Sequence, residues 1–135
     1  NPDRVKEVYD SVHGAIRENL LVSCHGCYRG GLAVSLAEKA IASGLGLTVR
    51  LEEVPEEGLE SMEEILYSES PGRFLVTVNQ EDRAEFESMI EDLPAAKIGT
   101  VEGDSLTIKA GKGDKQIDLS VEKLRESYTG TFGDF

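Results

Sequence analysis

The sequence predicts an α+β domain in which a mixed β-sheet of roughly four to six strands is covered by helices. Apolar residues recur at helical spacing in several segments, while shorter segments alternate apolar and polar residues in the manner of strands. Helices and strands alternate along most of the chain, and strands then follow one another directly. Because no internal repeat or linker interrupts this order, residues 1–135 are expected to form a single domain.

Composition indicates a globular domain and excludes several classes of function. The chain has 135 residues, of which 39% are hydrophobic and 30% are charged, which is enough to build a core. Its formal net charge of −12 argues against nucleic acid, because a phosphate backbone requires a basic surface. No apolar run reaches the roughly 20 residues of a membrane span, and no secretory signal occurs. Two cysteines without such a signal favour a reducing, cytoplasmic compartment.

The first two helices carry start and stop signals. Asn1-Pro2-Asp3 is typical of a helix N-terminus, and apolar residues then recur at helical spacing to about residue 18. A strand is expected over 21–24, followed by a turn. A strongly apolar helix over 31–43 should end at Gly44, since glycine favours a left-handed C-terminal cap. The apolar positions of the two helices are Val5, Val8, Val12 and Ile16, then Leu32, Ala33, Leu36, Ala37, Ala40 and Ile41.

Strands and helices continue to alternate in the middle of the chain. Alternating apolar and polar residues predict a half-buried strand over 47–51, and a short helix is expected from about Leu59 to Tyr67. Residues 73–78 give the strongest strand signal. Asn79 is expected to cap the next helix. The buried face of that helix would carry Phe86, Met89 and Ile90.

The last part of the chain is rich in strands. Residues 97–101 and 105–109 are predicted to form a β-hairpin around Glu102-Gly103-Asp104. The further elements are a turn at 111–114, a strand over 116–119, a helix capped by Ser120 with Val121, Leu124 and Tyr128 on one face, and a loosely held tail, 129–135.

The turn within residues 23–34 is the main candidate for a functional site. Gly30-Gly31 precedes a helix, so its backbone could accept positive φ angles and present N–H groups to a phosphate. The same glycines could equally serve only the tight strand-to-helix turn. Arg29 could bind a phosphate or lie in solvent, and Arg73 offers a similar choice between phosphate and a nearby glutamate.

Cys24 and Cys27 form a C-x-x-C pattern that permits three interpretations. A redox pair would use the following helix N-terminus to lower the pKa of a thiol. A zinc site would lack an obvious fourth ligand, since no second cysteine pair exists and His13 is the only histidine besides His25. Simple packing of two small side chains requires neither partner. Packing is therefore favoured, and no metal site is expected.

Three stretches, in this order, resemble one family. Residues 25–38, HGCYRGGLAVSLAE, are similar to its turn His-Asp-Val-Ser-Asp/Glu-Gly-Gly-Leu-Ala-Val-Ala-Leu-Ala-Glu. Residues 68–76, SESPGRFLV, are similar to its segment Ser-Glu-Ser-Pro-Gly-Arg-Phe-Val-Val, and 119–125 to its last helix. The family is the C-terminal domain of phosphoribosylformylglycinamidine synthase, within the aminoimidazole ribonucleotide synthetase-like superfamily.

The resemblance implies a part of a longer enzyme, and the start at Asn1 is consistent with a fragment. The whole enzyme would use ATP and Mg²⁺ to convert formylglycinamide ribonucleotide to its amidine, with glutamine-derived ammonia. Its partners would be an N-terminal ATP-binding domain and a glutaminase subunit or domain. No catalytic residue is expected in this chain. The resemblance implies substrate or phosphate contacts at His25, Arg29, Gly30 and Gly31, in the cleft between domains.

The central turn departs from the family pattern. Gly26 stands where the family has Asp, and Tyr28 and Arg29 stand where it has Ser and an acid, so two carboxylates are absent and a cation is added. A metal role for the turn is therefore not expected. Two alternatives remain open: a stand-alone structural or interaction domain of the same fold, and a sibling ATP-dependent enzyme such as selenophosphate synthetase.

Overall fold

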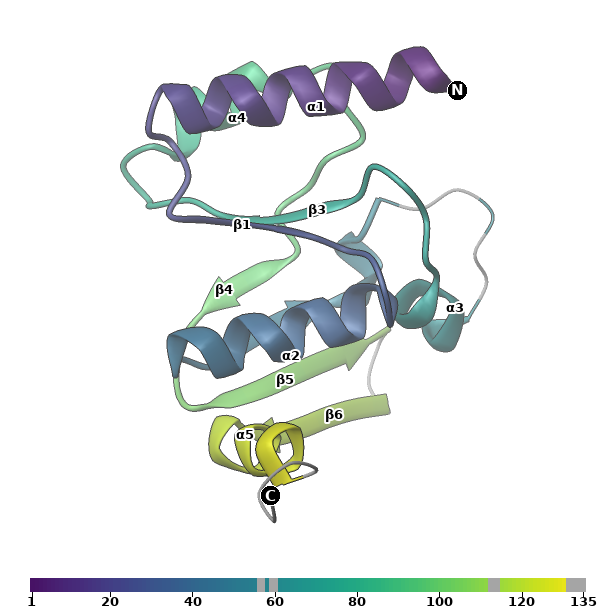
Figure 1. The fold of residues 1–135 in the computed structure, drawn as a ribbon, viewed down its shortest axis with the longest axis vertical. Helices are drawn as coiled ribbons and strands as arrows, with labels where there is room; N and C mark the ends of the chain where they lie inside the picture. The colour runs from purple at the N-terminus through teal and green to yellow at the C-terminus, as the bar shows by residue number, and fades with distance from the viewer. Residues whose placement is uncertain (56–57, 59–60, 112–114, 131–135) are drawn as a thin grey trace.

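Two β-sheets form the framework of the chain (Figure 1). The computed structural model describes residues 1–55, 58, 61–111 and 115–130. Strand β1 (Ser23–Gly26) pairs antiparallel with β3 (Phe74–Thr77) in a two-stranded ribbon. The second sheet has the order β4-β2-β5-β6, with β2 parallel to β5 and the outer pairs antiparallel. Its strands are β2 (Leu47–Arg50), β4 (Gly99–Val101), β5 (Ser105–Ala110) and β6 (Lys115–Ser120). The α+β class and the mixed sheet are confirmed, but β1 and β3 lie outside that sheet.

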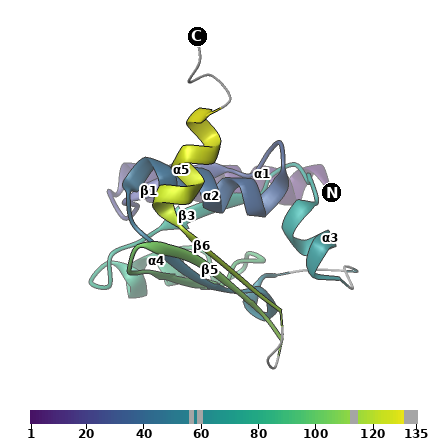
Figure 2. The same ribbon diagram turned by 90° about the horizontal axis from the view of Figure 1, so that it is seen from below.

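Helix α2 (Gly31–Ser43) occupies the centre of the domain (Figures 1 and 2). It packs against the β1–β3 ribbon, against β5 of the larger sheet, and against helices α3 and α5. Helix α1 lies on the other side of the ribbon, where the ring of Tyr9 meets the ring of Phe74 edge to face at 5.1 Å. The remaining helices are α1 (Pro2–Arg17), α3 (Met62–Tyr67), α4 (Arg83–Met89), α5 (Val121–Gly130) and the short 3₁₀ helix η1 (Leu51–Glu53).

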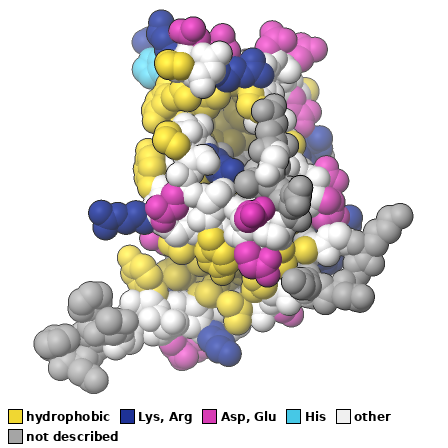
Figure 3. Space-filling view, turned by 90° about the vertical axis from the view of Figure 1, so that its right-hand side faces the viewer, with side chains coloured by type: hydrophobic (Ala, Val, Ile, Leu, Met, Phe, Trp, Pro, Cys, Tyr) yellow, Lys and Arg dark blue, Asp and Glu magenta, His cyan; other side chains and the backbone are white. Residues whose placement is uncertain are grey.

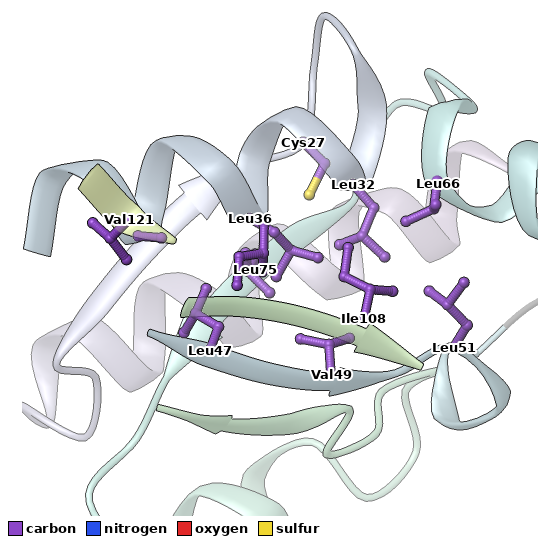
Figure 4. Packing of buried hydrophobic residues seen from close by; sticks show 12 residues of the cluster. Cys27, Leu32, Leu36, Leu47, Val49, Leu51, Leu66, Leu75, Ile108 and Val121 are labelled. Carbon is purple, nitrogen blue, oxygen red and sulfur yellow. The ribbon is translucent and has the colours of Figure 1, made fainter. Parts of the chain in front are cut away.

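The hydrophobic core lies between α2 and the four-stranded sheet (Figure 4). Leu32 and Leu36 of α2 point toward Leu47, Val49 and Ile108 of the sheet. Full burial of such side chains stabilises the fold by about 1.5–3 kcal/mol each. The cluster is completed by Cys27, Ala40, Leu51, Leu66, Leu75, Leu106 and Val121.

Most predicted helix ends are confirmed. The side chain of Asn1 accepts a hydrogen bond from the N–H of Asp3 at 3.0 Å, and Ser120 accepts one from Lys123 at 3.2 Å. Gly44 ends α2 in the left-handed conformation, with φ 70°. The predicted Asn79 cap is wrong, because the chain makes a turn first and Asp82 stands at the N-cap of α4.

Three side-chain or strand positions differ from the predictions. The first strand begins at Ser23 instead of residue 21, because its pairing with β3 starts at Thr77. On α1, Ile16 is 51% exposed and the neighbouring Ala15 is buried. Tyr128 of α5 is 62% exposed, although Val121 and Leu124 face inward as predicted. Leu59 of the predicted short helix, positions 112–114 of the predicted turn, and 131–135 of the tail lie outside the described residues.

The predicted hairpin between residues 97 and 109 is wrong. Strands β4 and β5 do not pair with each other, because β2 lies between them and pairs with both. Their short connection passes over the start of β2. There the N–H of Gly46 donates to the carbonyl of Gly103 at 2.8 Å, and the N–H of Glu102 donates to the carbonyl of Gly46 at 3.0 Å. A Cβ atom at Gly46 would collide with this connection.

Candidate functional site

Two of the stretches that carry the family resemblance meet in space. The backbone N–H of Gly30 donates to Glu69 Oε1 at 2.7 Å, and the N–H of Cys27 donates to the carbonyl of Arg73 at 2.9 Å. Arg73 also donates from Nη1 to Ser68 Oγ at 3.1 Å. We call the region formed by residues 27–31 and 66–73 the glycine joint. It connects the end of β1, the start of α2, the end of α3 and the start of β3.

Both glycines of the joint have left-handed backbone conformations, as predicted. The φ angle is 77° at Gly30 and 63° at Gly31. A Cβ atom on Gly31 would lie 2.7 Å from the carbonyl oxygen of Leu66 and 2.8 Å from that of Ser68. The position therefore needs glycine twice, once for its φ angle and once for the close approach of the α3 backbone. These contacts support the interpretation of Gly30-Gly31 as a tight structural turn.

The anion at the start of α2 is a side chain of the same protein. The N-terminus of a helix carries unpaired N–H groups and a partial positive charge, both of which favour a carboxylate. Glu69 supplies this carboxylate across 39 residues of sequence. Whether a phosphate also contacts the turn stays a prediction.

His25 joins β1 to α2. Its Nε2 lies 3.1 Å from Glu38 Oε2, and the two side chains are 38% and 40% exposed. His25 stands opposite Leu75 in the ribbon, so it is on the face of β1 that turns toward α2. The carboxylate of Glu38 fixes the orientation of the imidazole.

Tyr28 and Arg29 lie at the surface of the turn, where both side chains are exposed. Arg29 makes no hydrogen bond or ion pair with any residue that the structure describes. The ring of Tyr28 lies over Gly26, where a Cβ atom would be only 2.5 Å from it. The two departures from the family pattern at 26 and 28 are therefore coupled, because the loss of a side chain at 26 makes room for the tyrosine ring.

Cys24 and Cys27 are free thiols, of which Cys24 is exposed and Cys27 is buried. Cys27 is buried in the core, and its N–H continues the ladder beyond the end of β1. Three residues of extended chain span about 10 Å, and a disulfide needs Cα atoms within about 7 Å, so the two cannot be bridged in this conformation. Partial burial raises the pKa of the Cys24 thiol, and the nearby Lys39 opposes this rise. A raised pKa is the opposite of what an activated redox thiol requires.

Metal-ligating residues do not gather in the described part of the chain. No group of three or more His, Cys, Asp and Glu side chains there could hold a metal ion. No described helix is long and apolar enough to cross a membrane.

Glu38, Glu69 and Lys39 were not predicted to be site residues. Glu69 lies within a family-like segment, and that position could have pointed to it. Lys39 follows Leu32 by seven residues and Leu36 by three, which places it beside the buried stripe of an otherwise apolar helix. That spacing is the signal that could have identified it.

Comparison with known proteins defines the family. The family profile described as AIR synthase related protein, C-terminal domain, matches residues 1–110. The chain belongs to this family. The relatives named phosphoribosylformylglycinamidine synthase subunit PurL include proteins from Methanocaldococcus jannaschii, 33% identical over 96% of this chain, and Lactobacillus delbrueckii subsp. bulgaricus, 38% identical over 92%. The chain spans only 17% and 15% of the length of these relatives.

Solved structures show the same fold. PurL of Thermotoga maritima complexed with FGAR superposes on 93% of this chain with a TM-score of 0.78 and 20% identity, and the match covers 21% of that protein. The hydrogenase maturation protein HypE superposes on 84% of this chain with a TM-score of 0.69 and 21% identity, covering 41% of that protein. At these identities the likeness concerns the fold alone.

Proposed function

We propose that this chain is the C-terminal domain of a phosphoribosylformylglycinamidine synthase and acts as one part of a longer cytoplasmic polypeptide. The observation that carries the proposal is the match of 92–96% of the chain to relatives that bear this one name. The whole enzyme would consume ATP, with Mg²⁺, to activate the amide oxygen of formylglycinamide ribonucleotide. Ammonia from a glutaminase would then replace that oxygen and give the amidine.

The domain would form one wall of a cleft shared with an N-terminal ATP-binding domain, and it would be inactive alone. Within it, the glycine joint would hold the turn in place while Arg29 reaches a substrate phosphate. Arg29 suits this role because its guanidinium is exposed and can bind oxyanions with two hydrogen bonds. His25, Gly30 and Gly31 would shape the same wall. Any magnesium carboxylates would come from the other domains.

Two other functions remain to be distinguished from this one. The fold is shared with HypE, so a sibling ATP-dependent enzyme such as selenophosphate synthetase would have the same framework. The altered turn at Gly26 and Tyr28 is consistent with a stand-alone structural or interaction domain. The relatives at 33–38% identity favour the synthase over both.

The decisive experiment is to isolate the native polypeptide with an antibody to this chain. Its mass and its ATP- and ammonia-dependent conversion of formylglycinamide ribonucleotide would then be measured. We expect a polypeptide several times larger than 14.7 kDa that forms the amidine. A 14.7 kDa product would identify a stand-alone domain, and a large protein without this activity would favour a sibling enzyme.

The role of Arg29 has its own test in that full-length enzyme. Arg29→Ala should raise the KM for the ribonucleotide about tenfold, since the loss of a charge-assisted hydrogen bond weakens binding by roughly this factor. Arg50→Ala is the matched control, because Arg50 is also exposed and its loss removes the same charge. An active enzyme in which both substitutions leave KM unchanged would refute the phosphate contact and leave the family function intact.

A further inference from the structure

A wide groove lies beside the C-terminal half of α2. It has a volume of about 860 Å³ and lies among the start of β1, the ends of β3 and β4, the start of β2, and helices α2 and α5. Its walls are mostly apolar, and they include Val22, Leu45, Val101 and Tyr128, whose side chains are 41–62% exposed. We call it the α2 groove. Apolar concave sites with a few polar groups are the usual form of small-molecule sites.

Lys39 places a basic group beside this groove. It lines the α2 groove and also a second cavity of about 700 Å³ between α1, α4 and the two sheets. Figure 3, which views the molecule from the right-hand side of Figure 1, shows hydrophobic side chains around a hollow in its upper part, on the side away from the C-terminal half of α2. The thiols of Cys24 and Cys27 both interact electrostatically with the amine of Lys39, and Cys24 lines the α2 groove. Lys39 therefore borders both cavities, and among the described residues it is the only lysine that lines the α2 groove.

The amine of Lys39 is buried and has no acceptor among the described residues. Its Nζ atom is not accessible to solvent and has no hydrogen-bond partner in the part of the chain that the structure describes. Removal from water lowers the pKa of Lys39. A buried polar group without a partner is unfavourable, and a bound acceptor would remove that cost. The nearby Glu38 does not fill this role, because its Oε2 lies against His25.

We propose that the α2 groove binds a small monocarboxylate with an apolar body, whose carboxylate accepts hydrogen bonds from Lys39. The apolar walls match the body of such a ligand, and its single negative charge matches the single unpartnered amine. A nucleotide or another polyanion fits less well, because the chain carries a net charge of −12 and provides one lysine here. The four-carbon stem of the lysine is flexible, so the amine can turn toward a bound carboxylate. This inference does not depend on the proposed synthase function.

Octanoate and octan-1-ol are suitable probes, since they differ mainly in the charged group. Their binding to the 135-residue chain would be measured by calorimetry at pH 7. We expect octanoate to bind at a 1:1 ratio, and Lys39→Met to weaken it about tenfold or more, while the weaker binding of octan-1-ol stays within about twofold. Lys109→Met is the matched control, because Lys109 is exposed on β5 and its loss changes the net charge equally.

A second variant tests the groove without altering Lys39. Leu45 is 51% exposed at the edge of the groove, so Leu45→Glu should preserve folding and weaken octanoate by charge repulsion. Circular dichroism would establish that each variant is folded. The proposal is overturned if octanoate does not bind the wild type at millimolar concentration, or if Lys109→Met weakens it as much as Lys39→Met. It is also overturned if folded Lys39→Met and Leu45→Glu bind octanoate like the wild type.

Discussion

The two ends of helix α2 differ in how completely their polar groups and surfaces are matched. At the N-terminal end, Gly31 lies against the backbone of α3 and Glu69 accepts the N–H of Gly30. Toward the C-terminal end, the amine of Lys39 has no acceptor among the described residues, and large apolar side chains border an open groove. At the N-terminal end the N–H of Gly30 is paired within the chain, whereas the amine near the C-terminal end has no partner in the described part of the chain.

This difference predicts which end of α2 should tolerate substitution without loss of stability. In the glycine joint, Gly31 contacts the backbone of α3, and this backbone cannot move aside as a flexible side chain can. An added Cβ atom at Gly31 would therefore not be accommodated. A buried amine without an acceptor is a cost to the fold, so its removal should be neutral or favourable. Substitutions at the two ends should therefore change stability in opposite directions.

The largest effect is expected at Gly31. Gly31→Ala should reduce the free energy of unfolding by about 3–4 kcal/mol, because it combines a left-handed φ angle with overlap of the α3 backbone. Gly103→Ala is the matched control: its φ is 69° and no atom lies within 4 Å of the added Cβ. The control should lose only about 1 kcal/mol. Urea denaturation followed by circular dichroism measures both, and equal losses would contradict the close contact.

A smaller loss is expected at Glu69. Glu69→Ala should destabilise the chain by about 1 kcal/mol, since it removes the acceptor from a helix N-terminus. Glu69→Gln retains one acceptor oxygen and should lose less. Hydrogen exchange at the amide of Gly30 should become faster in the alanine variant and change little in the glutamine variant. Unchanged exchange in both would mean that the bond to Glu69 does not protect this amide.

The smallest effect, with the opposite sign, is expected at Lys39. Lys39→Met should raise the free energy of unfolding by about 0.5–1 kcal/mol at pH 7. The folded-state pKa of Lys39 lies below its ordinary value of 10.5, so its cost is present at low pH and disappears as the pH rises toward 10.5. The stability gained by Lys39→Met should therefore decrease as the pH rises toward 10.5. A Cys24→Ser background removes the more exposed of the two thiols, Cys24 and Cys27, that face the amine. A gain that grows with pH would contradict this account.

Local signals predicted the elements but not their pairing. Helix α2 has the predicted ends, since its apolar stripe and Gly44 act within a few residues of one another. The hairpin prediction failed, although Glu102-Gly103-Asp104 is a good turn. A turn sequence fixes a change of chain direction, but it does not fix which strands pair. Here β2, from about 50 residues earlier in the sequence, lies between β4 and β5 and pairs with both.

Residue types at short spacing were enough to predict the α+β class, the glycine turn and the family, because these features depend on local patterns. The sequence showed two family-like stretches, residues 25–38 and 68–76, but it did not show that they contact each other in the fold. Tertiary packing, in contrast, brings Glu69 to the turn and leaves the amine of Lys39 without an acceptor among the residues that the structure describes. Both outcomes depend on which segments pack against α2, and that choice is made by the burial of the whole core instead of by any local pattern.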